Sequence, residues 1–425
     1  MEERYEQQDL DNREVSVWKV VVAVVACFVL LLSLTVVVWW SIIGVKSFDE
    51  GMQAVGKLFG VTQPADPSQS AENNKVFQNR EQVVATMGET TLTNGQLQIY
   101  YWTGVVDFLK DNSDYIYYLG LDISKPLDEQ ECYMDAYDTW QDYFLQCALD
   151  DWHKYQSMAL EAQKEGMKLP ADLQKTLDEL ESRMTETATE NGYESVDALV
   201  QADYGPGCTF DDYAAYMQVY FLGYAYFNEH IEKVEINDQT LDAYYTEHEE
   251  ELTEQGFKKD GDKVYGVRHI LVEVVGTGEE DGKTVITDED WEACRKKAQD
   301  LLDEWLAGEH TENTFAELAK EHSADGGSSA NGGLYTGLDK NTNFVEPFKN
   351  WYLDENRKVG DYGLVKTTYG YHIMYQSTIE DSWKLECENR MYEEEATKIL
   401  DESTKTHPIT IEQSKVMIGA ADYSK

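Results

Sequence analysis

Hydrophobic and polar positions divide the chain into an apolar N-terminal segment and a long remainder with regular periodicity. One uncharged run covers Val20–Val45 and lies between Lys19 and Lys46. As a helix this run would rise roughly 39 Å at ~1.5 Å per residue, more than a hydrocarbon core of ~30 Å requires. The run is too long for a secretory signal, and no small-residue cleavage site follows it. The pattern therefore predicts an uncleaved, single-pass transmembrane anchor.

The residues on either side of this anchor predict its orientation. Residues 1–19 carry a slight excess of basic side chains over the following segment, where Lys46 and Lys57 are the nearest ones. Because positive charge collects on the cytoplasmic side, we expect a cytoplasmic N-terminus and a large extracytoplasmic part. Residues 46–79 are polar and lack sustained periodicity, so they are expected to form a flexible spacer.

A second interpretation of the apolar segment starts from Val24–Cys27, which resembles the lipobox of bacterial lipoproteins. In lipoproteins the cysteine is normally followed by a polar tether, whereas apolar residues follow Cys27 here. The uncleaved anchor is therefore the favoured interpretation, and lipidation of Cys27 stays open.

Residues 80–262 carry the pattern of a helical module. A capping-box signature at Thr93-x-x-Gln96 opens one predicted helix. Apolar and aromatic residues recur at three- and four-residue steps over Leu127–Glu165, which predicts a long helix ended by Gly166. We expect this module to be all-α.

The pattern changes after residue 262 and predicts an α+β domain over 263–380. A strand is expected over Val264–Val275, and Thr287 begins a capping-box pattern ahead of an amphipathic helix. Two more helices and two closing strands are expected over Phe315–His322, Val345–Tyr352, Gly363–Thr367 and Tyr371–Tyr375. Residues 381–425 are helical at first and then alternate between apolar and polar positions.

Charge and composition exclude several classes of function. The chain has 425 residues, with 35 Lys and Arg against 81 Asp and Glu, and its formal net charge is −46. This balance argues against a nucleic-acid binder, which needs a basic face. The six cysteines form no C-x-x-C pair, so neither a zinc ribbon nor a thioredoxin-type dithiol is expected. Five cysteines follow the anchor, an odd number, and Cys132 and Cys147 would lie about 22 Å apart along one predicted helix, so no disulfide framework is expected either. The chain also lacks the H-E-x-x-H and G-x-S-x-G motifs, and we expect neither a metal nor a cofactor.

Several ordered motifs in the α+β domain resemble those of parvulin-type peptidyl-prolyl cis–trans isomerases. The segments that carry the resemblance are Val267–Val272, Phe315–Ala319, Ser323–Asp325, Gly332–Gly333, Phe344–Phe348 and Val365–Ile373. The resemblance implies a four-stranded antiparallel sheet with surrounding helices. The helical module is similar to the chaperone domain of membrane-anchored extracytoplasmic foldases of the PrsA and SurA kind. That likeness implies that 381–425 packs back on the module.

The resemblance also implies a set of site residues. His269 and His372 match the paired histidines of the parvulin site, Thr367 matches the threonine that bonds the pair, and Asp325 matches a position held by cysteine or aspartate. The apolar wall that would receive the proline ring is matched by Leu334, Phe344 and Phe348. Rotation about an X–Pro bond breaks no covalent bond, so such a site needs no nucleophile.

The function that follows is a peptidyl-prolyl isomerase and chaperone for unfolded or partly folded secreted proteins outside the membrane. The loop around Gly332–Gly333 departs from the family pattern, because it has an extra residue and no acidic residue after the two glycines. The alternative is therefore a holdase or secretion-assembly factor whose parvulin domain binds peptides with little catalysis. The sequence leaves a homodimer open, and the lipid bilayer is the other expected partner.

Overall fold

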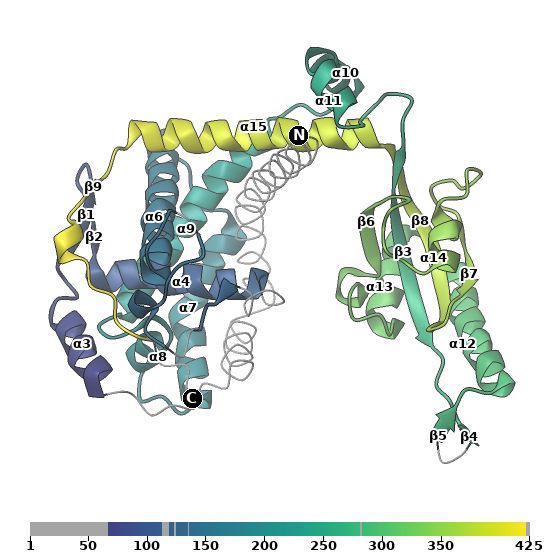
Figure 1. Cartoon of the computed structure of the whole chain (residues 1–425), viewed down its shortest axis with the longest axis horizontal. Coiled ribbons are helices and arrows are strands. Elements are labelled where there is room, and N and C mark those ends of the chain that lie inside the picture. The colour runs from purple at the N-terminus through teal and green to yellow at the C-terminus, as the bar shows by residue number, and fades with distance from the viewer. Residues whose placement is uncertain (1–66, 113–118, 123–124, 135, 281–282, 422–425) are drawn as a thin grey trace, which may run out of the picture. The chain divides into compact units, whose positions relative to one another are not determined.

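The computed structural model describes residues 67–112, 119–122, 125–134, 136–280 and 283–421, and the chain divides into two compact units. Of the described residues, those within 67–234 and 393–421 belong to the first unit, and those within 235–392 belong to the second (Figure 1). The predicted anchor, the spacer up to residue 66 and Cys27 lie outside the described residues. Within the described ranges, none of the helices combines the length and the apolar character that crossing a membrane requires.

The first unit is built mainly from helices whose beginnings are capped by side chains. Thr93, Thr139 and Thr209 each accept a hydrogen bond from the third helical residue and close a capping box. The helices are α3 (Pro67–Gln78), α4 (Asn94–Asp111), α6 (Trp140–Glu165), α7 (Ala171–Glu190), α8 (Val196–Tyr204) and α9 (Phe210–Ile231).

The long predicted helix begins later than expected. Residues Leu127–Glu129 form a short 3-10 turn, and α6 starts only after the Thr139 cap. Its predicted end is confirmed, because Gly166 adopts a left-handed conformation with φ of 73°. Threonine at 139 and aspartate at 142 satisfy the free amides at the start of the helix, and this local bonding overrides the apolar periodicity that continues upstream.

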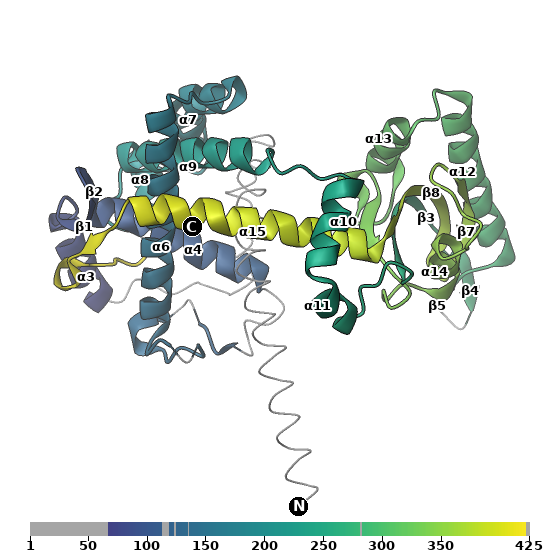
Figure 2. The ribbon, with the colours of Figure 1, turned by 90° about the horizontal axis from the view of Figure 1, so that it is seen from above.

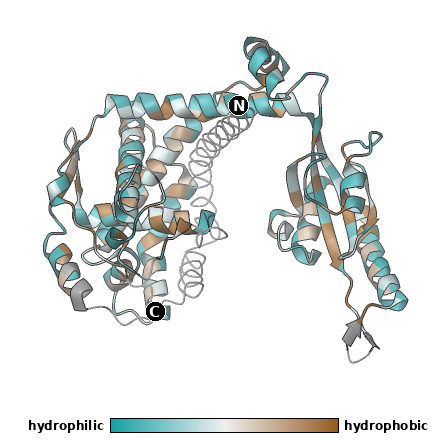
Figure 3. Ribbon diagram, in the orientation of Figure 1, coloured by the Kyte–Doolittle hydropathy of each residue, from teal (hydrophilic) through white to brown (hydrophobic). Residues whose placement is uncertain are grey.

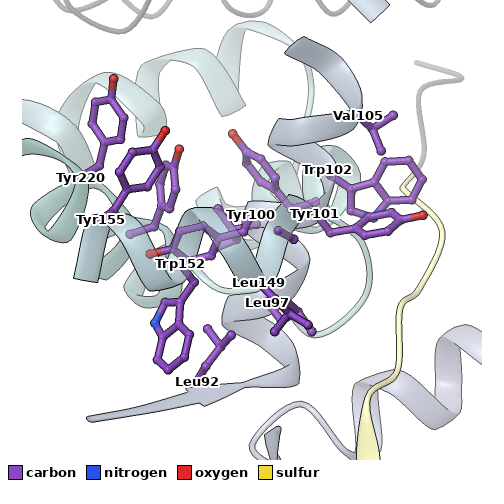
Figure 4. Packing of buried hydrophobic residues seen from close by; sticks show 14 of the residues in the cluster. Leu92, Leu97, Tyr100, Tyr101, Trp102, Val105, Leu149, Trp152, Tyr155 and Tyr220 are labelled. Carbon is purple, nitrogen blue, oxygen red and sulfur yellow. The ribbon is translucent and has the colours of Figure 1, made fainter. Parts of the chain in front are cut away.

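The core of this unit is aromatic and lies where α4, α6 and α9 meet. Figure 4 shows Tyr100, Trp152, Tyr155 and Tyr220 together in this cluster. A Cβ atom on Gly223 would lie 2.9 Å from the backbone oxygen of Tyr155, so α6 and α9 can approach this closely only with glycine there.

The expectation of an all-α module is wrong, because the first unit also contains a small three-stranded sheet. Strands β1 (Val83–Met87) and β2 (Thr90–Thr93) pair antiparallel, and β9 (Thr410–Ile411) adds to the other edge of β1. The turn between β1 and β2 places Gly88 at a φ of 58°, which favours glycine. The buried Asn94 side chain binds the backbone at Lys415 and Met417, which ties the C-terminal segment to α4.

The second unit contains a four-stranded antiparallel sheet, as predicted, with strand order β6-β3-β8-β7. The strands are β3 (Lys263–Glu273), β6 (Leu334–Leu338), β7 (Tyr362–Lys366) and β8 (Gly370–Asp381). Hydrophobic residues lie along its central strands (Figure 3). The unit also contains α10 (Asp238–Glu247), α11 (Glu249–Glu254), the hairpin of β4 (Gly278–Glu280) and β5 (Lys283–Val285), and the start of α15 (Ser382–Thr406), which ends in the first unit.

The two faces of this sheet are covered by different helices (Figure 2). Ile270 and Val272 of β3 pack with α12 (Asp288–Ala307) and α13 (Glu312–His322). Val267 packs on the other face with Phe348 of α14 (Glu346–Tyr352). Successive side chains of a strand point to opposite faces, so His269 shares the face of Val267.

The cysteines of the described residues carry free thiols. These residues are Cys132, Cys147, Cys208, Cys294 and Cys387.

Candidate active site

Two neighbouring central strands bring the predicted histidine pair together. His372 of β8 lies opposite Leu271 of β3, so it is the diagonal neighbour of His269 on the same face of the sheet. The two Nδ1 atoms are 3.0 Å apart, and the side chains are 3% and 5% exposed. Buried imidazoles at this separation must share a proton, and their tautomers are therefore coupled.

The partners of the two rings determine where each proton lies. Nε2 of His269 is 3.1 Å from Oδ2 of Asp325, and an ionised carboxylate can only accept, so this Nε2 carries a proton. Nδ1 of neutral His269 is then an acceptor, and Nδ1–H of His372 donates to it. Nε2 of His372 must therefore accept, and it lies 2.9 Å from Oγ1 of Thr367. The result is one directed chain of hydrogen bonds from Thr367 through both histidines to Asp325.

Each end of this chain is held by backbone contacts. The amide of Tyr369 donates to Oγ1 of Thr367 over 3.1 Å, which leaves the hydroxyl proton for His372. At the other end, the amide of Ala324 donates to the carbonyl oxygen of Leu271 over 2.9 Å. This bond anchors the loop after α13 to the edge of β3, and Asp325 follows directly.

The carboxylate of Asp325 accepts three side-chain hydrogen bonds at one oxygen. Oδ2 lies 3.0 Å from the hydroxyl oxygen of Tyr335, it is the atom that His269 reaches, and it also accepts from Ser328. These bonds, the one from His269 foremost, hold the pKa of Asp325 well below its usual range against the effect of burial. Asp325 is thus a fixed negative charge beside the histidine pair.

Stability should depend on pH through His372. Burial and the neighbouring His269 lower the pKa of His372 from 6.5 to about 4, while Asp325 acts in the opposite direction. Between pH 6.5 and 4, His372 is therefore protonated in the unfolded chain and neutral in the folded chain. The free energy of unfolding should fall as the pH is lowered through that window, by an amount on the order of 3 kcal/mol.

This pH dependence is measured by urea unfolding of the whole chain and of His372→Asn, which cannot titrate at this position. For each protein the free energy of unfolding is plotted against pH. The difference between the slopes of the two plots isolates His372 from other groups, such as Asp107, whose pKa burial raises to about 6. Identical slopes for both proteins would show that His372 does not titrate in this window.

An aromatic cluster lies against the histidine pair. The Phe348 ring stands edge-on to both imidazoles, with centroids 5.1 Å from that of His269 and 5.4 Å from that of His372. Phe344 stacks on Phe348 at 4.8 Å and is only half-buried, whereas Phe348 is 2% exposed. Phe348 thus belongs to the core under the site, and Phe344 presents the outer aromatic surface.

The structure does not bring Leu334, the third predicted residue of the apolar wall, to this cluster. Leu334 is paired with Arg268 and Tyr335 with Val267, and directly opposite residues point to the same face of a sheet. Leu334 therefore lies on the face of Arg268, opposite the histidines. Tyr335 takes the expected place, with its ring centroid 5.1 Å from that of Phe344.

Tyr335 and Ser328 are the site residues that the sequence reasoning missed. Ser328 lies three residues after Asp325, the spacing at which a loop side chain folds back on an acidic one, and this was the available signal. For Tyr335 the sequence holds no such signal, because only the pairing of β6 with β3 decides which residues of β6 point to the face of the histidines.

Gly333 of the loop has a specific steric role. Gly333 accepts a hydrogen bond from the amide of His269 over 2.8 Å, and its φ is 74°. A Cβ atom on Gly333 would lie 2.1 Å from the carbonyl oxygen of His269. Glycine is therefore required where the loop passes β3.

Comparison with known proteins gives this domain a family. Residues 252–377 match the model of the PPIC-type PPIASE domain. Foldase protein PrsA 1 of Listeria monocytogenes is 28% identical over 210 residues, which cover 45% of this chain and 55% of that protein. Foldase protein PrsA of Halalkalibacterium halodurans is 28% identical over 220 residues, 51% of this chain and 53% of that protein. The chain thus spans about half the length of these relatives.

A SurA chaperone and a solved PrsA structure also resemble the chain. Chaperone SurA of Pseudoalteromonas atlantica is 33% identical over 129 residues, 30% of this chain and 26% of that protein. The crystal structure of PrsA from Bacillus subtilis covers 66% of this chain and 92% of its own, at 18% identity and a TM-score of 0.31, too low to bear on the fold. Taken with the sheet and the histidine pair, the family match identifies residues 252–377 as a parvulin-type peptidyl-prolyl cis–trans isomerase domain, in a chain similar to foldases of the PrsA and SurA kind.

Proposed function

We propose that this protein is a membrane-anchored, extracytoplasmic foldase that accelerates X–Pro isomerisation in unfolded or partly folded secreted proteins. Within it, Asp325, His269, His372 and Thr367 form the catalytic constellation. The observation that carries the proposal is the continuous hydrogen-bond chain that links them beside an aromatic surface. Anchoring is assigned to Val20–Val45 on sequence grounds alone.

The chemistry needs only differential binding of a twisted amide. A planar X–Pro amide is stabilised by resonance that places negative charge on its carbonyl oxygen, and this resonance is lost when the bond rotates. A fixed carboxylate close to that oxygen, here Asp325, repels the planar forms more than the twisted one. Because the site then favours the twisted state relative to both planar states, rotation is accelerated without any covalent step.

The remaining residues would hold this geometry and receive the substrate. The proline ring would pack against the half-buried surface of Phe344 and Tyr335. His269 and His372 would keep Asp325 ionised and in place, since the chain of donors begins at Thr367 and ends on its carboxylate. We assign the histidines an orienting role rather than proton transfer.

Chaperone activity is assigned to the first unit. Its aromatic residues include Phe77 and Tyr133, whose side chains are 49% and 63% exposed and suited to contact apolar segments of unfolded chains. The acidic charge of the whole chain, −46, limits self-association of the protein while it holds such clients.

The test of this function is an isomerisation assay of the full-length protein on a proline tetrapeptide, run beside aggregation of a denatured protein whose refolding is not limited by proline. We expect acceleration above the spontaneous rate and suppression of aggregation. Suppression without acceleration would decide for the alternative, a holdase whose parvulin domain only binds peptides.

A further inference from the structure

The phenol of Tyr335 joins two parts of the site that the proposed function treats separately. Its hydroxyl reaches Oδ2 of Asp325 at 3.0 Å, and its ring lies over that of His269, with centroids 5.6 Å apart and planes at 25°. The same ring meets Phe344 edge-on. One side chain therefore holds the carboxylate and also forms part of the surface assigned to the proline ring.

The bond is directed from the phenol to the carboxylate. Burial and the charge of Asp325 both raise the pKa of Tyr335, so the hydroxyl stays protonated and acts as a donor. The donors that reach Asp325 from side chains of the described residues all converge on Oδ2, and none of them reaches Oδ1. This arrangement fixes the rotation of the carboxylate and leaves Oδ1 for the substrate amide.

The loop is shaped to admit this phenol. A Cβ atom placed on Gly327 would lie 2.6 Å from the hydroxyl oxygen of Tyr335, while its next neighbour, Oδ2 of Asp325, would be 3.8 Å away. The backbone of Gly327 is not in the left-handed region, so alanine would meet no backbone strain there. Of the three atoms nearest to that Cβ, the phenol hydroxyl is the one that it would clash with.

We propose that Tyr335 is the positioning residue of this active site: its hydroxyl, admitted by Gly327, sets the orientation of the Asp325 carboxylate toward the substrate amide. The proposal rests on the proposed isomerase function for its kinetic consequence. Its structural content, that the phenol holds an ionised Asp325, stands independently of catalysis.

The kinetic test uses the full-length protein and three substitutions. Tyr335→Phe keeps the ring and removes the donor, and Gly327→Ala displaces the hydroxyl while the tyrosine remains. Each should lower kcat/KM on a proline tetrapeptide about tenfold, the loss of one hydrogen bond to a charged group, mainly through kcat. The double variant should be no worse than either single one. Tyr362→Phe is the matched control, because Tyr362 lies against Trp305 on the opposite face, and it should behave as wild type.

Coupling to Asp325 separates positioning from a general structural effect. In an Asp325→Asn background, Tyr335→Phe should change kcat/KM less than twofold, because the carboxylate on which the phenol acts is gone. Where the wild-type protein accelerates isomerisation, an undiminished tenfold loss in that background, or wild-type kinetics for Tyr335→Phe, would overturn the proposal.

The pKa of Asp325 tests the phenol–carboxylate contact without an activity assay, so this test does not depend on the isomerase function. Titration of the Asp325 carboxyl by ¹³C NMR in full-length protein should show a higher pKa in Tyr335→Phe and in Gly327→Ala than in wild type, since each loses a donor to the ionised form. The titratable groups that face this carboxylate are His269 from β3 and Tyr335 from β6, with His372 acting through His269. An unchanged pKa would overturn the proposal. A raised pKa in a protein that never accelerates isomerisation would refute the isomerase function and support the phenol–carboxylate contact.

Discussion

Replacing His269 by alanine is expected to lower kcat/KM on a proline tetrapeptide by about 100-fold, the largest kinetic effect predicted for this domain. The substitution removes the acceptor of the His372 Nδ1 proton and the donor to Asp325 in one step. Asp325 then loses the strongest of the contacts that keep it ionised and oriented. The buried Nδ1–H of His372 is left without its partner, which should also cost about 1–3 kcal/mol of folding free energy.

The measurement is the rate of isomerisation together with the free energy of unfolding in urea. His322→Ala is the matched control, because His322 is a histidine of the same domain whose Nε2 lies 3.7 Å from Oε1 of Glu321 and not against the site. It should leave kcat/KM within a factor of two of wild type and the free energy of unfolding unchanged. If His269→Ala keeps wild-type kcat/KM while it remains folded, the histidine pair has no part in catalysis.

Replacing Phe348 by alanine should have the largest effect on stability, about 3–5 kcal/mol. The ring is 2% exposed and packs with Phe344, Tyr352 and both histidines. Its removal opens a void beneath the site and withdraws the edge contacts that hold the imidazoles. We therefore expect kcat/KM to fall as well, even for the fraction of molecules that stays folded.

Phe315→Ala separates these two effects. Phe315 is equally buried but belongs to the core on the other face of the sheet, against Trp305. Its loss should destabilise the domain to a similar extent and leave the kcat/KM of the folded protein unchanged. Urea unfolding monitored by far-UV circular dichroism gives the stabilities, and rates are compared below the unfolding transition. If Phe315→Ala and Phe348→Ala lower kcat/KM equally, Phe348 acts only through stability.

Features that depend on a few neighbouring residues were predictable from the sequence. The capping boxes at Thr93 and Thr287 and the left-handed stop at Gly166 were all expected and are all present. Each is decided by bonds between residues three or four positions apart. The same locality explains the error at Leu127, because an unnoticed cap at Thr139 decides where α6 begins.

The histidine pair was predictable for a different reason. His269 and His372 are far apart in the chain, and only the ordered motifs of a known family linked them in advance. Periodicity placed each in a strand, but the diagonal register that brings the two Nδ1 atoms to 3.0 Å comes from the pairing of β3 with β8.

What the sequence by itself determined is therefore the locally capped helices, the α+β class of the second unit with its sheet strands, and the histidine, threonine and aspartate of the candidate site. The tertiary structure alone decided that β9 returns to β1, and that Tyr335 rather than Leu334 lies beside the histidines. A strand alternates its side chains with a period of two, so a shift of one residue in its pairing moves every side chain to the other face. The partner strand β3 lies about sixty residues earlier in the chain, so no local pattern in β6 contains the register of this pairing.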